Sequence, residues 1–258
     1  MTLTLFIILL LGLTIGSFLN VVIDRLPRGE QIWSGRSHCD SCKHQLGLFD
    51  LIPILSFLIL NKKCRYCRAK ISWQNPLVES INALLYLGVY AFLIHRYQYL
   101  NINSLIYLFV IISGLIVIFF VDLKDGIIPD SIIVGLTGST LVYIFLTDRN
   151  ILRDHFLWGL IMSGIFLSLV LGTRGKGMGL GDVKYAFLMG FILGFPESLV
   201  AFYLAFLTGA AFSIILILRR KKTMKSKIPF GPFLVMATLT SLFFGSNLWL
   251  VFKELIGL

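Results

Sequence analysis

Long apolar runs dominate this sequence, and they decide the class of fold that the chain can adopt. The candidate spans are residues 2–23, 77–95, 103–121, 128–147, 155–172, 184–196, 197–218 and 232–252. A helix of about 20 apolar residues crosses the hydrocarbon core of a bilayer. The sequence therefore predicts an all-α polytopic membrane protein with about eight transmembrane helices. Seven or nine transmembrane helices are the alternatives. The run 184–196 is short and contains Pro196, which allows a tilted, broken or partly inserted segment.

Composition supports this class. The chain is 57% hydrophobic and only 14% charged, whereas soluble domains are about 45–50% apolar and about 25% charged. A net charge of +10 is also found in nucleic-acid-binding proteins, so the distribution of the basic residues has to decide between the two explanations.

The basic residues are concentrated on one predicted side of the membrane. If the N-terminus is outside, the inside segments are 24–76, 122–127, 173–184 and 219–231, and they hold 19 of the 23 Lys and Arg residues. Cytoplasmic loops carry such an excess. We therefore expect these segments in the cytoplasm and no nucleic-acid partner. The run 219–227 is predicted to touch anionic lipid headgroups.

Residues 24–76 form the one sizeable soluble segment, between a first transmembrane helix at 1–23 and a membrane domain at 77–258. This segment contains all four cysteines, as two CxxC pairs with 21 residues between them: Cys39, Cys42, Cys64 and Cys67. Four thiolates in this arrangement are typical of a structural zinc site. A pair of redox or disulfide dithiols is the alternative, although a cytoplasmic location disfavours disulfides.

An apolar stretch lies between the two cysteine pairs. Residues 48–60 are too few to cross a bilayer, and Pro53 interrupts them. Their length favours a re-entrant or interfacial segment.

Two acidic residues stand where apolar runs end or begin. Asp122 follows the run 103–121 directly, and Asp182 lies in the glycine-rich stretch 177–184. An ionisable residue at the edge of a membrane span is costly, and it is by default a candidate functional residue. We interpret Asp122 and Asp182 as a pair.

Three acids in or near these two stretches also have a structural explanation. Asp182 can cap the helix that it precedes, which is compatible with catalysis. Asp125 next to Gly126 is typical of a turn, and Asp130 after Pro129 can stabilise a helix start through the helix dipole.

Two carboxylates in a low-dielectric place share a proton, because both cannot easily be ionised. The ionised member can act as general base on a water while the protonated member polarises a carbonyl. The pattern therefore predicts aspartic-protease chemistry. A transporter or channel that uses both acids as an ion relay remains an alternative, as does a zinc-binding interaction module without activity.

At this point the sequence resembles a known family. Gly179-Leu180-Gly181-Asp182 resembles the GxGD signature of intramembrane aspartic proteases, and the wider pattern resembles type IV prepilin peptidases, the A24 family. The matching features are Gly16 to Val22 leading into Arg25-Leu26-Pro27, the paired CxxC, Leu51 to Ser56, Ile71-Ser72 with Pro76 and Glu79, Asp122 with Ile128-Pro129-Asp130, Gly179 to Lys184, and a weaker echo at Pro229 to Phe233.

The resemblance implies roles for several residues. The catalytic aspartates fall on Asp122 and Asp182, with Asp125 as the rival of Asp122. The zinc ligands fall on the four cysteines. Supporting roles go to Gly179, Gly181, Lys184, Asp130 and Glu79, and Glu79 and Asp50 are candidates for reading a basic leader.

The resemblance also implies a substrate and a place. It implies cleavage of the short basic leader of type IV prepilins or pseudopilins at the cytoplasmic face of the bacterial cytoplasmic (inner) membrane. It further implies N-methylation of the new N-terminus with S-adenosylmethionine. No residue is assigned to this methyl donor, because the chain lacks a glycine-rich strand–turn–helix motif.

Overall fold

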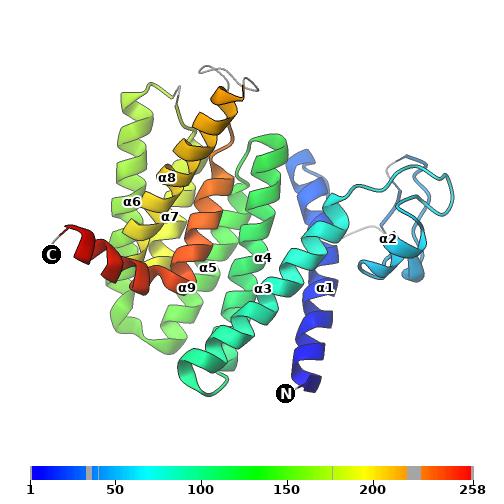
Figure 1. Cartoon of the computed structure of the whole chain (residues 1–258), viewed down its shortest axis with the longest axis horizontal. Coiled ribbons are helices and arrows are strands. Elements are labelled where there is room, and N and C mark those ends of the chain that lie inside the picture. The colour runs from blue at the N-terminus through cyan, green and yellow to red at the C-terminus, as the bar shows by residue number, and fades with distance from the viewer. Residues whose placement is uncertain (1, 33–36, 40, 176, 220–227, 257–258) are drawn as a thin grey trace. The chain divides into compact units, whose positions relative to one another are not determined.

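The computed structural model describes residues 2–32, 37–39, 41–175, 177–219 and 228–256, and it divides into two compact units, 1–117 and 118–258. In this described part every regular element is a helix (Figure 1), and β structure is limited to two isolated bridges. The expected all-α architecture is therefore confirmed. The finer division into 1–23, 24–76 and 77–258 stays a prediction.

The first unit is built on two long helices that approach each other closely. Its elements are α1 (Thr2–Arg25), η1 (Leu26–Arg28), η2 (Leu48–Asp50), α2 (Leu55–Ile59), α3 (Gln74–Tyr97) and the first part of α4 (Ile102–Asp125). A Cβ at Gly12 or Gly16 would lie 2.6 Å from the Cα of Ala83 or 2.7 Å from the Cα of Glu79. Small residues four apart permit this approach between membrane helices, and they set the distance between α1 and α3.

The second unit contains the end of α4 and five further α-helices. They are α5 (Asp130–Thr147), α6 (Leu152–Gly172, preceded by η3, Arg149–Ile151), α7 (Leu180–Leu193), α8 (Glu197–Leu218) and α9 (Gly231–Ile256). The last turns of α4, α6 and α8 and the first turns of α5, α7 and α9 lie at one end of this unit (Figure 1). The end of α4 and the start of α7, which carry the two acidic motifs, therefore lie at the same end.

Seven of the described helices are long and apolar enough to cross a membrane: α1, α3, α4, α5, α6, α8 and α9. The expected number of eight is not confirmed, because α7 has only 14 residues. At 1.5 Å per residue such a helix is about 21 Å long, whereas the hydrocarbon core is about 30 Å thick. The helix at the expected run 184–196 is therefore shorter than a full span, and ten of the fourteen residues of α7 are buried.

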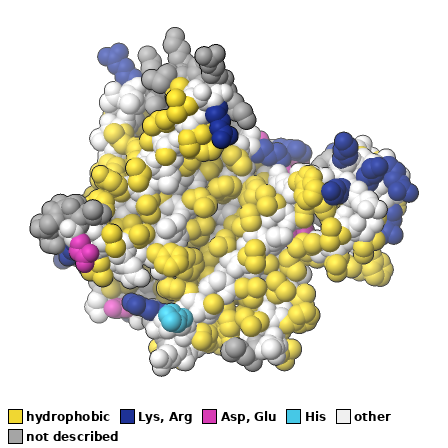
Figure 2. Space-filling view, in the orientation of Figure 1, with side chains coloured by type: hydrophobic (Ala, Val, Ile, Leu, Met, Phe, Trp, Pro, Cys, Tyr) yellow, Lys and Arg dark blue, Asp and Glu magenta, His cyan; other side chains and the backbone are white. Residues whose placement is uncertain are grey.

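The long helices carry the surface expected of a multi-pass membrane protein. Hydrophobic side chains cover much of the face shown in Figure 2, and large ones such as Leu84, Val134 and Leu207 are exposed. Contiguous apolar surface of this kind is rare on soluble monomers. The lipid-contact prediction for 219–227 falls, except for Arg219, on residues outside the described ranges.

Candidate active site and metal centre

Asp122 lies in the last turn of α4, and its side chain faces inward. It is only 5% exposed, and its Oδ2 accepts a 2.8 Å hydrogen bond from the backbone N–H of Gly231, at the start of α9. Asp125, three residues later, is exposed. The helix periodicity therefore buries one of the two candidate acids and leaves the other at the surface.

Asp182 closes the first turn of α7. Gly179 is the residue that caps this helix, in an extended conformation, and Asp182 occupies the third helical position. Its Oδ2 accepts the N–H of Gly179 at 3.0 Å. Asp182 thus stabilises the helix start from inside the first turn.

Asp122 acts electrostatically on Asp182. Asp182 lies outside the seven candidate spans, and its pKa is raised to about 6, first by burial and further by the negative charge of Asp122, against the opposing effect of the Gly179 N–H. This raised pKa keeps Asp182 protonated to a higher pH than a free aspartic acid, so one of the two acids can hold a proton.

The other residues of the glycine motif have distinct positions. A Cβ on Gly181 would lie 3.3 Å from the Cβ of Ile128, so this glycine allows the loop before α5 to approach α7. Lys184 donates one 2.7 Å hydrogen bond to each of the two carboxylate oxygens of Asp130. Both side chains are more than half exposed, and exposed ion pairs contribute only about 0–1 kcal/mol. We therefore interpret this pair as a tie between α5 and α7.

Gly231 is the functional candidate that sequence reasoning did not identify. Its signal was the weak echo at Pro229 to Phe233, which carried no role. A Cβ at this position would lie 2.5 Å from Oδ2 of Asp122, so only glycine lets the backbone donate to that carboxylate at this distance.

Aromatic packing holds the Gly231 backbone in place. The ring of Phe230 lies 5.1 Å from that of Phe206 and 6.5 Å from that of Phe166. Gly209 on α8 makes room for it, since a Cβ there would be 3.1 Å from the Phe230 ring. A donor fixed by packed rings needs little rearrangement to hold the carboxylate.

The four cysteines converge in the first unit. Their sulfur atoms all lie within 4.8 Å of one another, and Sγ of Cys39 is 3.8 Å from Sγ of Cys67. Tetrahedral zinc with Zn–S bonds of about 2.3 Å places its ligands about 3.8 Å apart. Two separate dithiols would not bring four sulfurs to one point, so the geometry fits a metal ion.

The two cysteine hairpins have the same backbone design. Lys43 donates its N–H to the carbonyl of Cys39, Arg68 does the same to Cys64, and Lys43 and Arg68 both have positive φ. The backbone N–H of Cys42 lowers the pKa of the Cys39 thiol to about 7, whereas, against the backbone N–H of Ala69, burial and the other three thiols raise the pKa of the Cys67 thiol to about 11. Backbone donors that favour thiolate prepare such a cluster for a cation.

The segment 48–60 is a turn and a short helix rather than a span. Leu48 and Phe49 are 86% and 77% exposed, as an interfacial segment requires, and its place in the membrane stays a prediction. Asp50 accepts hydrogen bonds from Arg65 and from the N–H of Gly47. Both hydrogen-bond donors therefore belong to the cysteine-containing segment 24–76.

Glu79 holds the same segment from the side of α3. Its Oε2 accepts the backbone N–H of Ile54 at 2.7 Å. Ile54 has a φ of +60°, which is unusual for a β-branched residue. Glu79 thus stabilises a strained backbone position, in addition to any contact with a substrate.

Comparisons with known proteins identify the family. A family model described as Bacterial Peptidase A24 N-terminal domain matches residues 10–93, and one described as Type IV leader peptidase family matches residues 109–214. A prepilin leader peptidase/N-methyltransferase of Aeromonas salmonicida is 32% identical, over 94% of this chain and 91% of that protein. The chain belongs to the type IV leader peptidase family.

Other relatives agree with this membership. Proteins of the same name from Pseudomonas aeruginosa and Bacillus subtilis are 28% and 27% identical, over 96% and 94% of this chain and 93% and 95% of their own lengths. No solved structure matches the chain significantly. The leader peptidase family match contains Asp122 and Asp182, whereas the four cysteines lie in the N-terminal match.

Proposed function

We propose that this chain is a membrane aspartic endopeptidase that removes the basic leader of type IV prepilins or pseudopilins and N-methylates the new N-terminus. One observation carries the peptidase assignment. Asp122 and Asp182 are buried at one end of the second unit, each carboxyl is held by a backbone N–H, and the charge of Asp122 acts on Asp182. The names of the relatives support the substrate class and the second activity.

The pair can hydrolyse a peptide bond without a covalent intermediate. Asp122, ionised, takes a proton from water, and the water oxygen attacks the carbonyl carbon while Asp182 donates its proton to the carbonyl oxygen. Collapse of the tetrahedral species breaks the C–N bond, the proton held by Asp122 passes to the leaving amine, and Asp182 takes back one hydroxyl proton as the new carboxyl group forms, so both acids return to their starting states. Both backbone hydrogen bonds use Oδ2, so we assign the water and carbonyl contacts to Oδ1 of each carboxyl.

The location of the pair suits a membrane-anchored substrate. We place this end of the unit at the cytoplasmic face of the bacterial inner membrane, because the inside segments hold 19 of the 23 basic residues. The cut site of a prepilin, between a basic leader and an apolar stem, would lie at this depth. An ion relay would favour acids nearer the middle of a span than Asp122 and Asp182, which stand at helix ends.

The four cysteines would hold a structural zinc ion, and S-adenosylmethionine would supply the methyl group. When bound, this donor offers an electrophilic methyl on a sulfonium to the amine that cleavage exposes. The chain has to hold the donor, bring the amine to it and accept the proton that the amine releases.

A reconstituted assay tests this function. The purified chain in lipid vesicles is mixed with a purified prepilin and an isotopically labelled methyl donor, and the products are weighed. We expect loss of the leader mass and gain of one methyl group on the mature part. A prepilin that remains intact at the normal mass would contradict the peptidase assignment.

The cleavage rate should fall as the pH rises above about 6. The mechanism needs one protonated carboxyl, and the pKa of Asp182 is raised to about 6 by burial and by Asp122. Above this pH Asp182 loses its proton, so both groups are carboxylates and neither can protonate the carbonyl. Initial rates measured from about pH 5 to about pH 8 would show this alkaline limb, and a rate that keeps rising through this range would contradict it.

Replacing Gly231 by alanine should lower the cleavage rate by roughly 10²-fold, the loss typical of one fixed hydrogen-bond donor at a reacting centre. The new methyl group would meet Oδ2 of Asp122, so the carboxylate or the start of α9 has to move. Gly135 is the matched control, because a Cβ on this glycine of α5 meets nothing within 4 Å. Equal rates for Gly231→Ala and Gly135→Ala would refute the role of Gly231.

A further inference from the structure

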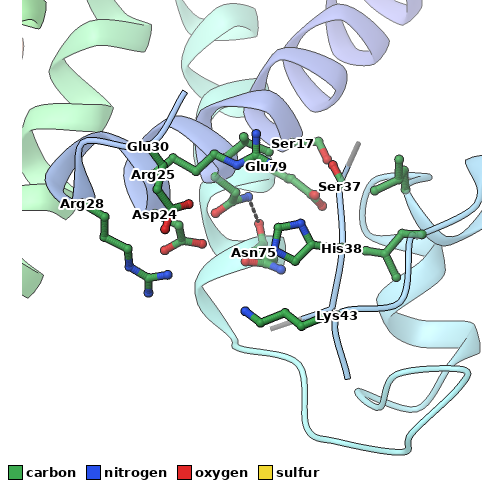
Figure 3. A pocket seen from close by; sticks show the side chains of 14 residues that line it. Ser17, Asp24, Arg25, Arg28, Glu30, Ser37, His38, Lys43, Asn75 and Glu79 are labelled. Atoms are coloured by element: carbon green, nitrogen blue, oxygen red, sulfur yellow. Dashed lines mark hydrogen bonds between the residues drawn. The ribbon is translucent and has the colours of Figure 1, made fainter. Parts of the chain in front are cut away.

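The first unit contains a polar cavity that the peptidase chemistry does not use. It encloses about 180 Å³ between the end of α1, η1, the first cysteine hairpin and the start of α3 (Figure 3). It is partly open, and exposed side chains such as Arg28 and Lys43 lie at its mouth. All the residues that line it belong to residues 1–117.

A buried acceptor on the wall of this cavity has no partner. Asn20 is 6% exposed, and its Nδ2 donates to the carbonyls of Gly16 and Asn75, the second of which is drawn in Figure 3. Its Oδ1 has no hydrogen bond. Buried polar atoms nearly always have partners, and Asn20, unlike the similarly unpartnered Asn82, lines the cavity, so its oxygen can accept a hydrogen bond from a ligand there.

The cavity wall carries charges of both signs. Asp24, Glu30 and Glu79 contribute carboxylates. Arg25, Arg28 and Lys43 contribute cations, and all six side chains are labelled in Figure 3. A ligand with one ammonium and one carboxylate meets this arrangement with opposite charges at each end. A strongly basic peptide does not, because it would face the arginines and the lysine.

We propose that this cavity binds the aminocarboxylate end of the methyl donor S-adenosylmethionine, with its ammonium on Oδ1 of Asn20 and its carboxylate toward Arg28 and Lys43. This inference rests on the proposed N-methylation. It agrees with the division of the chain, since the leader peptidase family match begins at residue 109 and leaves the cavity to the N-terminal match.

The size of the cavity sets how much of the donor it holds. Pockets for whole drug-sized ligands measure about 300–1,000 Å³, more than the 180 Å³ enclosed here. The cavity therefore holds the amino-acid part, and the adenosyl part lies in the open mouth.

Donor binding to the full chain, without prepilin, tests the proposal. Radiolabelled S-adenosylmethionine is titrated into the purified protein in detergent micelles. The wild-type protein should bind it saturably, and Asn20→Leu should weaken binding about tenfold or more, as expected for one hydrogen bond to a charged group. Unlabelled methionine should compete for the site, since it carries the same aminocarboxylate.

Asn82 provides a matched control for the buried substitution. It is fully buried between the same two helices, donates its Nδ2 to the carbonyl of Gly12, and also has an Oδ1 without a partner, but it does not line the cavity. Asn82→Leu therefore repeats the loss of a buried amide away from the cavity. It should bind the donor as the wild-type protein does.

Surface variants keep the test decisive if the buried variants do not fold. Arg28 and Lys43 are exposed. The substitutions Arg28→Gln and Lys43→Gln should each weaken donor binding several-fold. Lys63→Gln, an exposed lysine of the same segment that does not line the cavity, should not.

Three results would overturn the proposal. They are no saturable binding to the wild-type protein, unchanged affinity in Arg28→Gln and Lys43→Gln, and displacement of the donor by a basic leader peptide but not by methionine. The last result would make the cavity a reader of the substrate. Failure of the peptidase assignment is a separate observation, because Asp182→Asn should lose prepilin cleavage and still bind the donor.

Discussion

Asp122→Asn and Asp182→Asn should each reduce leader cleavage by roughly 10²–10⁴-fold, the range expected when a positioned acid or base is lost. Asparagine has nearly the same shape, and its carbonyl oxygen can still accept the N–H of Gly231 or of Gly179. The fold should therefore survive while the ability to take up or release a proton is lost. Single-turnover cleavage of a purified prepilin measures the effect on the chemical step.

Asp125→Asn is the matched control for this experiment. Asp125 belongs to the same helix turn as Asp122, but its side chain is exposed, and we expect it to retain cleavage. Asp130→Asn should also retain most activity, because the ion pair that it removes is exposed. Loss of cleavage in Asp125→Asn together with normal cleavage in Asp122→Asn would reverse the assignment.

Cys64→Ser should release the metal ion and destabilise the cysteine module. Cys64 is the buried member of the four, at 4% exposure, and a serine hydroxyl does not supply the thiolate that a structural zinc site requires. We expect metal affinity to fall by at least about 100-fold, more than for the loss of an outer-shell partner. Elemental analysis of the purified protein measures the metal, and limited proteolysis within residues 24–76 measures the order of the module.

Ser41→Ala provides the comparison for the cysteine variant. Ser41 is an exposed residue of the first CxxC pair whose side chain is not a ligand, so its replacement should change neither metal content nor proteolysis. Wild-type protein without bound zinc, or Cys64→Ser with a full complement of it, would refute the metal centre.

Local sequence patterns predicted most of the architecture. The apolar runs identified the membrane helices because burial in lipid requires long uninterrupted segments. The paired CxxC motifs predicted the cysteine cluster because two hairpins can each place two thiolates on one ion. The family resemblance, carried by motifs from Gly16 to Lys184, is confirmed by the relatives.

Local patterns were less informative where helix length and helix position matter. The run 184–196 was expected as an eighth span, and this number is not confirmed, because α7 ends at Leu193 and has only 14 residues. Asp182 was expected as a possible cap of the following helix, whereas Gly179 caps it and Asp182 binds back from the third position. The residue at which a helix ends depends on a few hydrogen bonds, so the residue composition of an apolar run does not locate that end accurately.

The sequence by itself determined the membrane class, the cluster of four cysteines and the two candidate aspartates, because each depends on hydrophobicity, spacing or residue type within a short stretch. Only the tertiary structure decided that Asp122 faces inward while Asp125 does not, that Gly231 donates to Asp122 from 109 residues away, and that Asn20 opens on a charged cavity. These features are contacts between distant segments. They arise when helices pack and close-range glycines set the distances between them, and no local pattern encodes them.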